Sequence, residues 1–154
     1  MAIEIERKFT VKSQSYRELS SSSKIAQGYI CNEKNRVVRV RIYGEKAFIT
    51  IKDAAVEFSR HEFEYEIPIA DAQELLDVMC QKPIIEKTRY RYPFKGFCWE
   101  IDEFHGDNEG LIIAEIELPE KQSEFEKPDF INEEVTHDTR YYNSNLIDKP
   151  YKKW

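Results

Sequence analysis

Alternation with a period of two runs through most of this sequence and constrains its fold more than any other feature. Successive side chains of a β-strand point to opposite faces, so this spacing predicts strands. Short glycine-containing connections between the runs favour hairpins and antiparallel pairing. The predicted strands are Ile3–Phe9, Gln27–Cys31, Arg36–Tyr43, Ala47–Lys52, Phe58–Pro68, Ile84–Tyr92, Phe97–Phe104 and Leu111–Leu118.

Four segments depart from the alternation. Ser13–Leu19 predicts a short helix, and Ala70–Cys80 has the apolar spacing of an amphipathic helix capped by Asp71. Ser20–Ser23 predicts a loop, and a further helix is indicated around Arg140–Leu146. A chain of 154 residues is the size of one domain. We therefore expect a single mainly β (α+β) domain over residues 1–154, with a few helices packed outside the strands.

One face of nearly every predicted strand is charged, while the opposite face is apolar. The commonest cause of this pattern is an antiparallel sheet with one solvated face. The charged positions comprise the acids Glu4, Glu6, Glu62, Glu64, Glu66, Glu100, Asp102, Glu115 and Glu117. They also comprise the bases Lys8, Arg39, Arg41, Lys52, Arg60, Lys87, Arg89 and Arg91.

Three properties of this charged face favour an enclosed lumen over a solvated surface. Its residues are almost all ionisable, whereas solvated faces usually mix charges with neutral polar side chains. The signs are segregated by strand, with Arg39 and Arg41 on one strand and Glu115 and Glu117 on another, although like charges along a strand repel. Eight strands are enough to close a barrel around one small ligand. We therefore expect a closed eight-stranded antiparallel β-barrel with a charged lumen.

The overall charge and the cysteine pattern exclude several classes of partner. A formal net charge of −6 argues against nucleic acid, because that binding is driven by positive surface. No window approaches the roughly 20 apolar residues of a membrane helix, and the N-terminus lacks the apolar stretch of a secretion signal. Cys31, Cys80 and Cys98 are odd in number and share no metal-type spacing. We expect a cytoplasmic protein that binds neither nucleic acid nor a membrane.

A lumen of this kind suits a phosphate chain together with divalent cations. Arginine holds phosphate through a two-pronged fork and lysine holds it as a point charge. Clustered carboxylates repel the same anion unless cations lie between them. The pairs Glu4/Glu6 and Glu115/Glu117 supply the hard oxygen ligands that Mg²⁺ or Mn²⁺ prefers. The combination favours phosphoryl transfer, in which positioning and charge neutralisation carry most of the catalysis.

The ordered set of motifs resembles the CYTH superfamily, also called the triphosphate tunnel metalloenzymes. The resemblance covers essentially the whole chain and implies an eight-stranded tunnel that acts on triphosphate-bearing small molecules with Mg²⁺ or Mn²⁺. The motifs are Glu4-Ile5-Glu6-Arg7-Lys8, Arg39-Val40-Arg41, Thr50-Ile51-Lys52, Glu62 to Glu66, Lys87-Thr88-Arg89, Trp99-Glu100-Ile101-Asp102, Glu115-Ile116-Glu117 and Arg140-Tyr141-Tyr142-Asn143.

The resemblance also implies a role for each matching residue. Metal binding falls to Glu4, Glu6, Glu115 and Glu117, with Glu62, Glu64 or Asp102 at a second metal. Phosphate binding falls to Lys8, Arg39, Arg41, Lys52, Lys87 and Arg89. The catalytic group is formed by Glu4, Glu6, Lys87 and Glu117.

Among the activities that the family implies, this compact chain is most similar to the small inorganic tripolyphosphatases. We therefore expect a metal-dependent hydrolase that converts tripolyphosphate to pyrophosphate and phosphate. A class IV-type adenylate cyclase, a thiamine or nucleoside triphosphatase, and a noncatalytic polyphosphate- or nucleotide-binding module are the alternatives. The residues predicted to face the lumen are charged from one end of the barrel to the other. This leaves no pocket for a nucleobase and favours tripolyphosphate over ATP as the substrate. A homodimer is left open.

Overall fold

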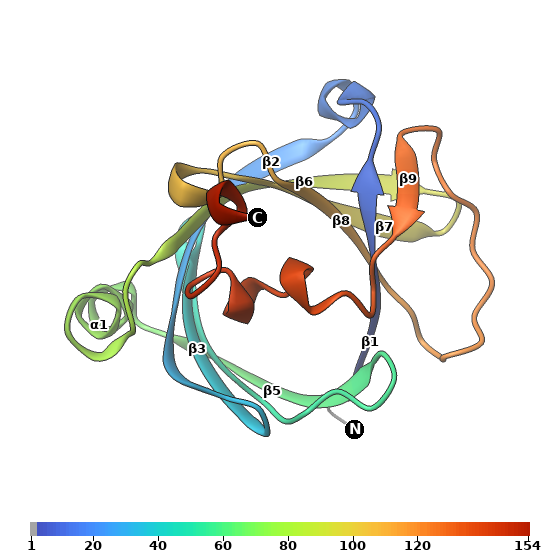
Figure 1. Cartoon of the computed structure of the whole chain (residues 1–154). Helices are drawn as coiled ribbons and strands as arrows, with labels where there is room; N and C mark the ends of the chain where they lie inside the picture. Colours follow the sequence, from blue (N-terminus) through green and yellow to red (C-terminus); the bar gives the residue numbers. More distant parts are fainter. Residues whose placement is uncertain (1–2) are drawn as a thin grey trace.

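The computed structural model describes residues 3–154, and its centre is a closed β-barrel (Figure 1). The strands pair antiparallel in the order β5-β4-β3-β2-β6-β7-β8-β1, and β1 pairs with β5 to close the ring. This confirms the predicted eight-stranded antiparallel barrel. The strands of the ring are β1 (Ile3–Val11), β2 (Ser21–Glu33), β3 (Arg36–Tyr43), β4 (Lys46–Lys52), β5 (Ser59–Ile67), β6 (Ile85–Phe94), β7 (Phe97–Phe104) and β8 (Ile112–Glu117).

Strand β1 closes the barrel by dividing one of its edges between two neighbours. Glu4 lies opposite Arg60 in β5, and farther along β1 Phe9 lies opposite Glu134 in the short strand β9 (Ile131–Glu134). The sequence did not predict β9, because its four residues are mostly polar and give too short a run for alternation to register. This extra strand ties the segment that follows β8 back to the barrel wall.

Within residues 3–154, one short α-helix packs outside the barrel, where the sequence predicts a few. Helix α1 (Ile69–Glu74) continues into a π-helical turn, Leu75–Met79, and lies over the outer face near β3 (Figure 1). The predicted cap at Asp71 is wrong, because the N-cap residue is Pro68 and Asp71 lies within the first turn. Gly28 allows this close approach, since a Cβ there would stand 2.9 Å from Cys80 Cβ and 3.1 Å from Leu76 Cδ2.

Two other local predictions are also corrected. Ser21–Ser23 belong to β2 and not to a loop, because β2 extends along β6 until Ser21 lies opposite Arg91. The helix expected around Arg140–Leu146 is instead two 3₁₀ turns, Thr139–Tyr141 and Asn143–Asn145. The helix predicted over Ser13–Leu19 is confirmed in part, as the 3₁₀ turn Ser15–Glu18. Two further 3₁₀ turns are Gly106–Asn108 and Tyr151–Lys153.

The apolar faces of the strands point outward and are covered on two sides. One cluster buries Phe9, Trp99 and Ile116 beneath the segment that carries Phe130. A second cluster buries Val40 and Leu76 where α1 and its π-helical turn meet the barrel. The C-terminal segment runs across the barrel opening rather than outside it (Figure 1). Among the helices of residues 3–154, none is long and apolar enough to cross a membrane.

Candidate active site

A cavity of about 420 Å³ occupies the interior of the barrel. Small-molecule sites commonly measure about 300–1,000 Å³. Of the residues that the sequence assigns to metal, phosphate or catalysis, only Asp102 is missing from the lining. Those that line it are Glu4, Glu6, Lys8, Arg39, Arg41, Lys52, Glu62, Glu64, Lys87, Arg89, Glu115 and Glu117. The pleat of the strands therefore gathers residues far apart in sequence on one enclosed surface.

The two ends of this lumen differ in polarity. Along β6 the lumen-facing bases pass from Lys87, which is 2% exposed, to Arg91, which lies in solvent. At the opposite end the lumen positions become apolar, and Leu146 and Ile147 of the C-terminal segment pack among them. The apolar positions are Tyr29, Val37, Ile85, Phe104, Leu111 and Ile113. The expectation of a lumen charged from end to end is therefore wrong.

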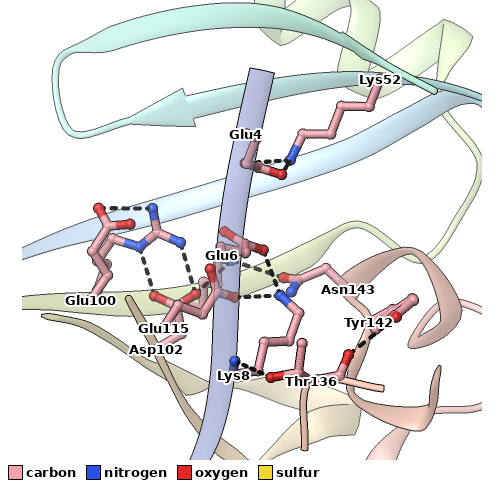
Figure 2. Close-up of polar contacts among 12 residues, drawn as sticks. Glu4, Glu6, Lys8, Lys52, Glu100, Asp102, Glu115, Thr136, Tyr142 and Asn143 are labelled. Carbon is pink, nitrogen blue, oxygen red and sulfur yellow. Dashed lines mark hydrogen bonds and ion pairs between the residues drawn. The ribbon is translucent and has the colours of Figure 1, made fainter. Parts of the chain in front are cut away.

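Lys8 links two acidic residues from adjacent strands (Figure 2). Its Nζ lies 2.8 Å from Glu6 Oε1 and 2.9 Å from Glu115 Oε1. Burial alone would lower the pKa of Lys8, but Glu115 and Glu6 raise it well above its ordinary value. Burial likewise opposes the charge of Glu6, and Lys8 nevertheless lowers the pKa of that carboxyl. Lys8 and Glu6 are therefore both charged at neutral pH.

A second cluster surrounds the carboxylate of Glu4. Lys52 Nζ lies 3.1 Å from both Glu4 oxygens, and Arg60 Nε lies 3.2 Å from Glu4 Oε1. Lys52 also lies 3.2 Å from Glu62 Oε2. Arg60, one of the bases on the predicted charged face, thus faces the lumen opposite β1. Glu4 is consequently neutralised by two bases.

The third cluster contains Lys87, Arg89 and Asp102. Arg89 donates to both oxygens of Asp102, at 2.8 and 2.9 Å, and Lys87 Nζ lies 2.8 Å from Asp102 Oδ2. Asp102 is fully buried behind these two bases and does not line the cavity. Burial lowers the pKa of Lys87 to about 8, although Asp102 acts in the opposite direction. Both Asp102 oxygens are thus occupied by bases, which places this residue poorly for a metal.

Arg39 and Arg41 are held much more loosely than Arg89. They approach one carboxylate oxygen of Glu64 at 3.6 and 3.4 Å, and that oxygen also accepts a bond from Thr50. The Nε–H groups of both arginines are buried and find no hydrogen-bond partner among residues 3–154. Burial lowers the pKa of Arg41 to about 10, and the positive charges of Arg39 and Arg89 act in the same direction. This wall carries more positive charge than its own carboxylate neutralises.

Glu117 is the acidic counterpart of these unpaired bases. Burial raises its pKa to about 7, and the charges of Glu4, Glu62 and Glu6 add to the effect. Within residues 3–154 it forms no ion pair, and it lies directly opposite Glu6 in the pairing of β1 with β8. Like charges opposite one another on a sheet are destabilising. The site thus concentrates negative charge that no lysine or arginine offsets.

The acidic residues fit a divalent cation by the chemistry of their oxygens, which are hard ligands suited to Mg²⁺ or Mn²⁺. In the described part of the chain no three metal-ligating side chains converge closely enough to form a site as they stand. The reason is that Lys8 engages Glu6 and Glu115, while Lys52 engages Glu4. A cation at this position therefore has to compete with two lysines for the carboxylates.

Several cavity residues were missed by the sequence reasoning. Tyr43 and Phe48 line the cavity beside Arg41, whose guanidinium lies 5.3 Å from the Tyr43 ring and 6.0 Å from the Phe48 ring. Tyr43 lies two residues after Arg41 and Phe48 two residues before Thr50, so the alternation of the strands already placed both rings on the lumen face. Thr136, Tyr142, Asn143 and Ser144 also line the cavity and come from the C-terminal segment, where only the Arg140–Asn143 motif gave a hint.

The comparisons with known proteins agree with this geometry. The CYTH domain family matches residues 2–151. An inorganic triphosphatase of Acetivibrio thermocellus is 51% identical over 154 residues, covering 100% of this chain and 99% of the relative. An inorganic triphosphatase of Nitrosomonas europaea is 35% identical over 147 residues, covering 93% and 95%. The crystal structure of an inorganic triphosphatase aligns with a TM-score of 0.65 at 29% identity, covering 93% and 96%. A charged tunnel of eight strands and a family match over nearly its whole length show that this chain belongs to the CYTH domain family.

Proposed function

We propose that this chain is a single-domain, metal-dependent hydrolase that cleaves inorganic tripolyphosphate to pyrophosphate and phosphate. One observation carries the proposal: the cavity wall holds charges of both signs that lack partners. In the described part of the chain, the buried Nε–H groups of Arg39 and Arg41 have no acceptor, and Glu117 has no base. A linear polyanion satisfies the arginines, and a cation satisfies the acid. Membership of the CYTH family and relatives named inorganic triphosphatases support the same activity.

The basic residues of the cavity would bind phosphate in two ways. We assign Arg39 and Arg41 to bidentate contacts with phosphate oxygens, because their guanidinium groups retain free donors. Lys8, Lys52, Lys87 and Arg89 complete the phosphate-binding wall as charges fixed by neighbouring acids. These contacts hold the substrate in one line along the tunnel, and such positioning supplies much of the catalysis in phosphoryl transfer.

The acids form the opposite side of the site. We assign Glu4, Glu6, Glu115 and Glu117 to a first cation, and Glu62 and Glu64 to a second. When bound, Mg²⁺ or Mn²⁺ supplies charge neutralisation and a more acidic water for attack on phosphorus. Asp102 is not among these ligands, because both of its oxygens are paired with bases. Its two oxygens orient Lys87 and Arg89, and it acts on the substrate only through them.

Phosphate release tests the proposed function directly. The purified chain should be assayed with tripolyphosphate, pyrophosphate, ATP and thiamine triphosphate, each with Mg²⁺, with Mn²⁺ and with excess chelator. Tripolyphosphate should be cleaved only when a metal is added, because the carboxylates otherwise repel the substrate. Full hydrolysis in excess chelator would overturn the metal assignment. Absence of any tripolyphosphate cleavage with either metal would overturn the hydrolase assignment itself.

ATP hydrolysis is a second candidate activity, and Tyr43 and Phe48 favour it because two aromatic rings line the cavity. Aromatic faces can accept a nucleobase by stacking. The surrounding groups are nevertheless mainly charged, so kcat/KM for tripolyphosphate should exceed that for ATP by at least about tenfold, or ~1.4 kcal/mol. ATP should lose its terminal phosphate. Formation of cyclic AMP and pyrophosphate, detected by chromatography, would instead favour a cyclase.

A further inference from the structure

The ammonium group of Lys87 is held between two acceptors that come from different parts of the molecule. Its Nζ lies 2.8 Å from Asp102 Oδ2 in β7 and 2.8 Å from Asn143 Oδ1 in the C-terminal segment. A lysine ammonium has three N–H donors, so one donor remains. We propose that Asn143 is a positioning residue, which holds Lys87 so that this remaining donor is available to a substrate phosphate. This inference rests on the proposed function.

Asp102 alone is poorly suited to hold Lys87 in that position. It is fully buried, lies outside the cavity lining and already accepts two hydrogen bonds from Arg89. A lysine held by Asp102 alone would be drawn toward Arg89 and into the wall. Asn143 does line the cavity, and it approaches the ammonium group from the C-terminal segment. Two acceptors from two elements therefore fix the direction of the ammonium group.

Asn143 is itself held firmly by contacts on both sides. The fully buried Gln27 donates from Nε2 to the same Oδ1 at 3.3 Å. The next residue is tied to β2, because Asn32 Nδ2 donates to the Ser144 carbonyl at 2.7 Å. Leu146, which has no exposed surface, then anchors the segment in the apolar end of the lumen. Figure 2 shows Asn143 projecting from this segment toward the group of residues around Lys8.

The neutrality of the Asn143 amide matters as much as its position. An amide oxygen accepts the Lys87 hydrogen bond without adding charge to a cavity that has to receive a polyanion. An aspartate of the same shape would still accept that bond. It would also place a second negative charge beside Lys87, in addition to that of Asp102, and repel phosphate oxygens. The C-terminal segment therefore completes the phosphate-binding wall with a group that orients a base and adds no further negative charge beside it.

Steady-state kinetics with tripolyphosphate and saturating Mg²⁺ tests this role. Asn143→Ala should raise KM about tenfold, because a charge-assisted hydrogen bond that directs Lys87 toward the substrate is lost. Its kcat should change less than about twofold, since Lys87 remains present. Asn143→Asp should raise KM further although it preserves the shape of the side chain. Asn145→Ala is the matched control, because that amide lies in the same 3₁₀ turn and donates outside the cavity to the Thr139 carbonyl.

A double-mutant cycle separates positioning from a merely structural role. If Asn143 acts through Lys87, then Asn143→Ala should add less than about twofold to the defect of Lys87→Ala. The four proteins should also be compared by calorimetric binding of tripolyphosphate, which does not depend on turnover. An unchanged KM in Asn143→Ala, or an equal effect with and without Lys87, would overturn the inference. An inactive wild-type chain would instead overturn the proposed function, so the two failures are distinguishable.

Discussion

Two groups of lumen charges differ in how completely the protein satisfies them. The closed charge cluster comprises Lys87, Arg89 and Asp102, whose polar atoms meet at 2.8 to 2.9 Å and whose carboxylate is fully buried. The open charges are Arg39, Arg41 and Glu117. The arginines share one Glu64 oxygen at 3.6 and 3.4 Å, and their Nε–H groups are unpaired within the residues that the structure describes. Glu117 forms no ion pair with any of those residues.

The difference separates groups that are oriented before a ligand arrives from groups that the ligand itself satisfies. Charges fixed in advance cost no reorganisation when the substrate binds. Buried donors without acceptors raise the free energy of the empty protein and gain most from a bound anion. Substitution of Asp102, which lies behind the cavity wall, should therefore act mainly on stability, whereas substitutions of the open charges should act mainly on activity.

Asp102→Asn should give the largest effect, and it should appear as a loss of stability. The change leaves two buried bases without their counter-charge, and removing one partner of a buried ion pair costs about 3–5 kcal/mol. Denaturant unfolding of the metal-free protein measures this quantity. Glu33→Gln is the control, because the exposed pair of Glu33 with Arg36 should contribute at most about 1 kcal/mol. A stable Asp102→Asn protein with weakened metal binding would return Asp102 to the metal ligands.

Glu117→Gln should have the next largest effect, on turnover and not on folding. Removing one preorganised electrostatic group from an active site commonly lowers kcat by about 10²–10³-fold. The free energy of unfolding at pH 8 should not fall, because the charged carboxyl has no base to lose. Phosphate release and denaturant unfolding of the same preparation measure both quantities, with Glu45→Gln in the exposed β3–β4 hairpin as control. Near-normal turnover would remove Glu117 from the proposed site.

Arg41→Ala should lower kcat/KM for tripolyphosphate by about 10–100-fold, the loss expected for hydrogen bonds to a charged ligand. Arg41→Lys should recover only part of it, because lysine lacks the bidentate fork. The free energy of unfolding should change by less than about 1 kcal/mol in either variant, since the charged guanidinium is poorly paired. Arg36→Ala on the same strand is the control. If Arg41→Lys matched the wild type, its fork would not contact phosphate.

The smallest effect should be a pH dependence of stability in chelator-containing buffer. The pKa of Glu117 is raised from 4.5 to about 7, so near pH 6 the folded protein binds a proton that the unfolded chain does not. The free energy of unfolding should therefore fall as pH rises from about 4.5 to 7. Glu117→Gln should remove this part of the slope. An unchanged slope in that variant would mean that Glu117 titrates near its ordinary pKa.

Much of the barrel and most of the cavity lining followed from the sequence, because a strand has a fixed side-chain period. Alternation places Glu4 and Glu6 on one face of their strand and Arg39 and Arg41 on one face of theirs. Closing the sheet into a barrel then turns both charged faces toward the same lumen. Alternation also places Tyr43 and Phe48 on the lumen face, but they were missed because only the charged residues of that face were considered. The short strand β9 lay below the length at which alternation can be recognised.

Tertiary structure alone decided which charges are satisfied and where the C-terminal segment lies. Alternation places Asp102 and Glu117 on the lumen faces of neighbouring strands. Asp102 is nevertheless buried between two bases, whereas Glu117 forms no ion pair within residues 3–154. Strand register and tilt set those distances, and they depend on pairings between residues far apart in the chain. Asn143 meets Lys87 for the same reason, because Leu146 seats its segment among apolar side chains from several strands. Periodicity along a sequence determines which face a side chain occupies, whereas its neighbours on that face are fixed only when the barrel closes.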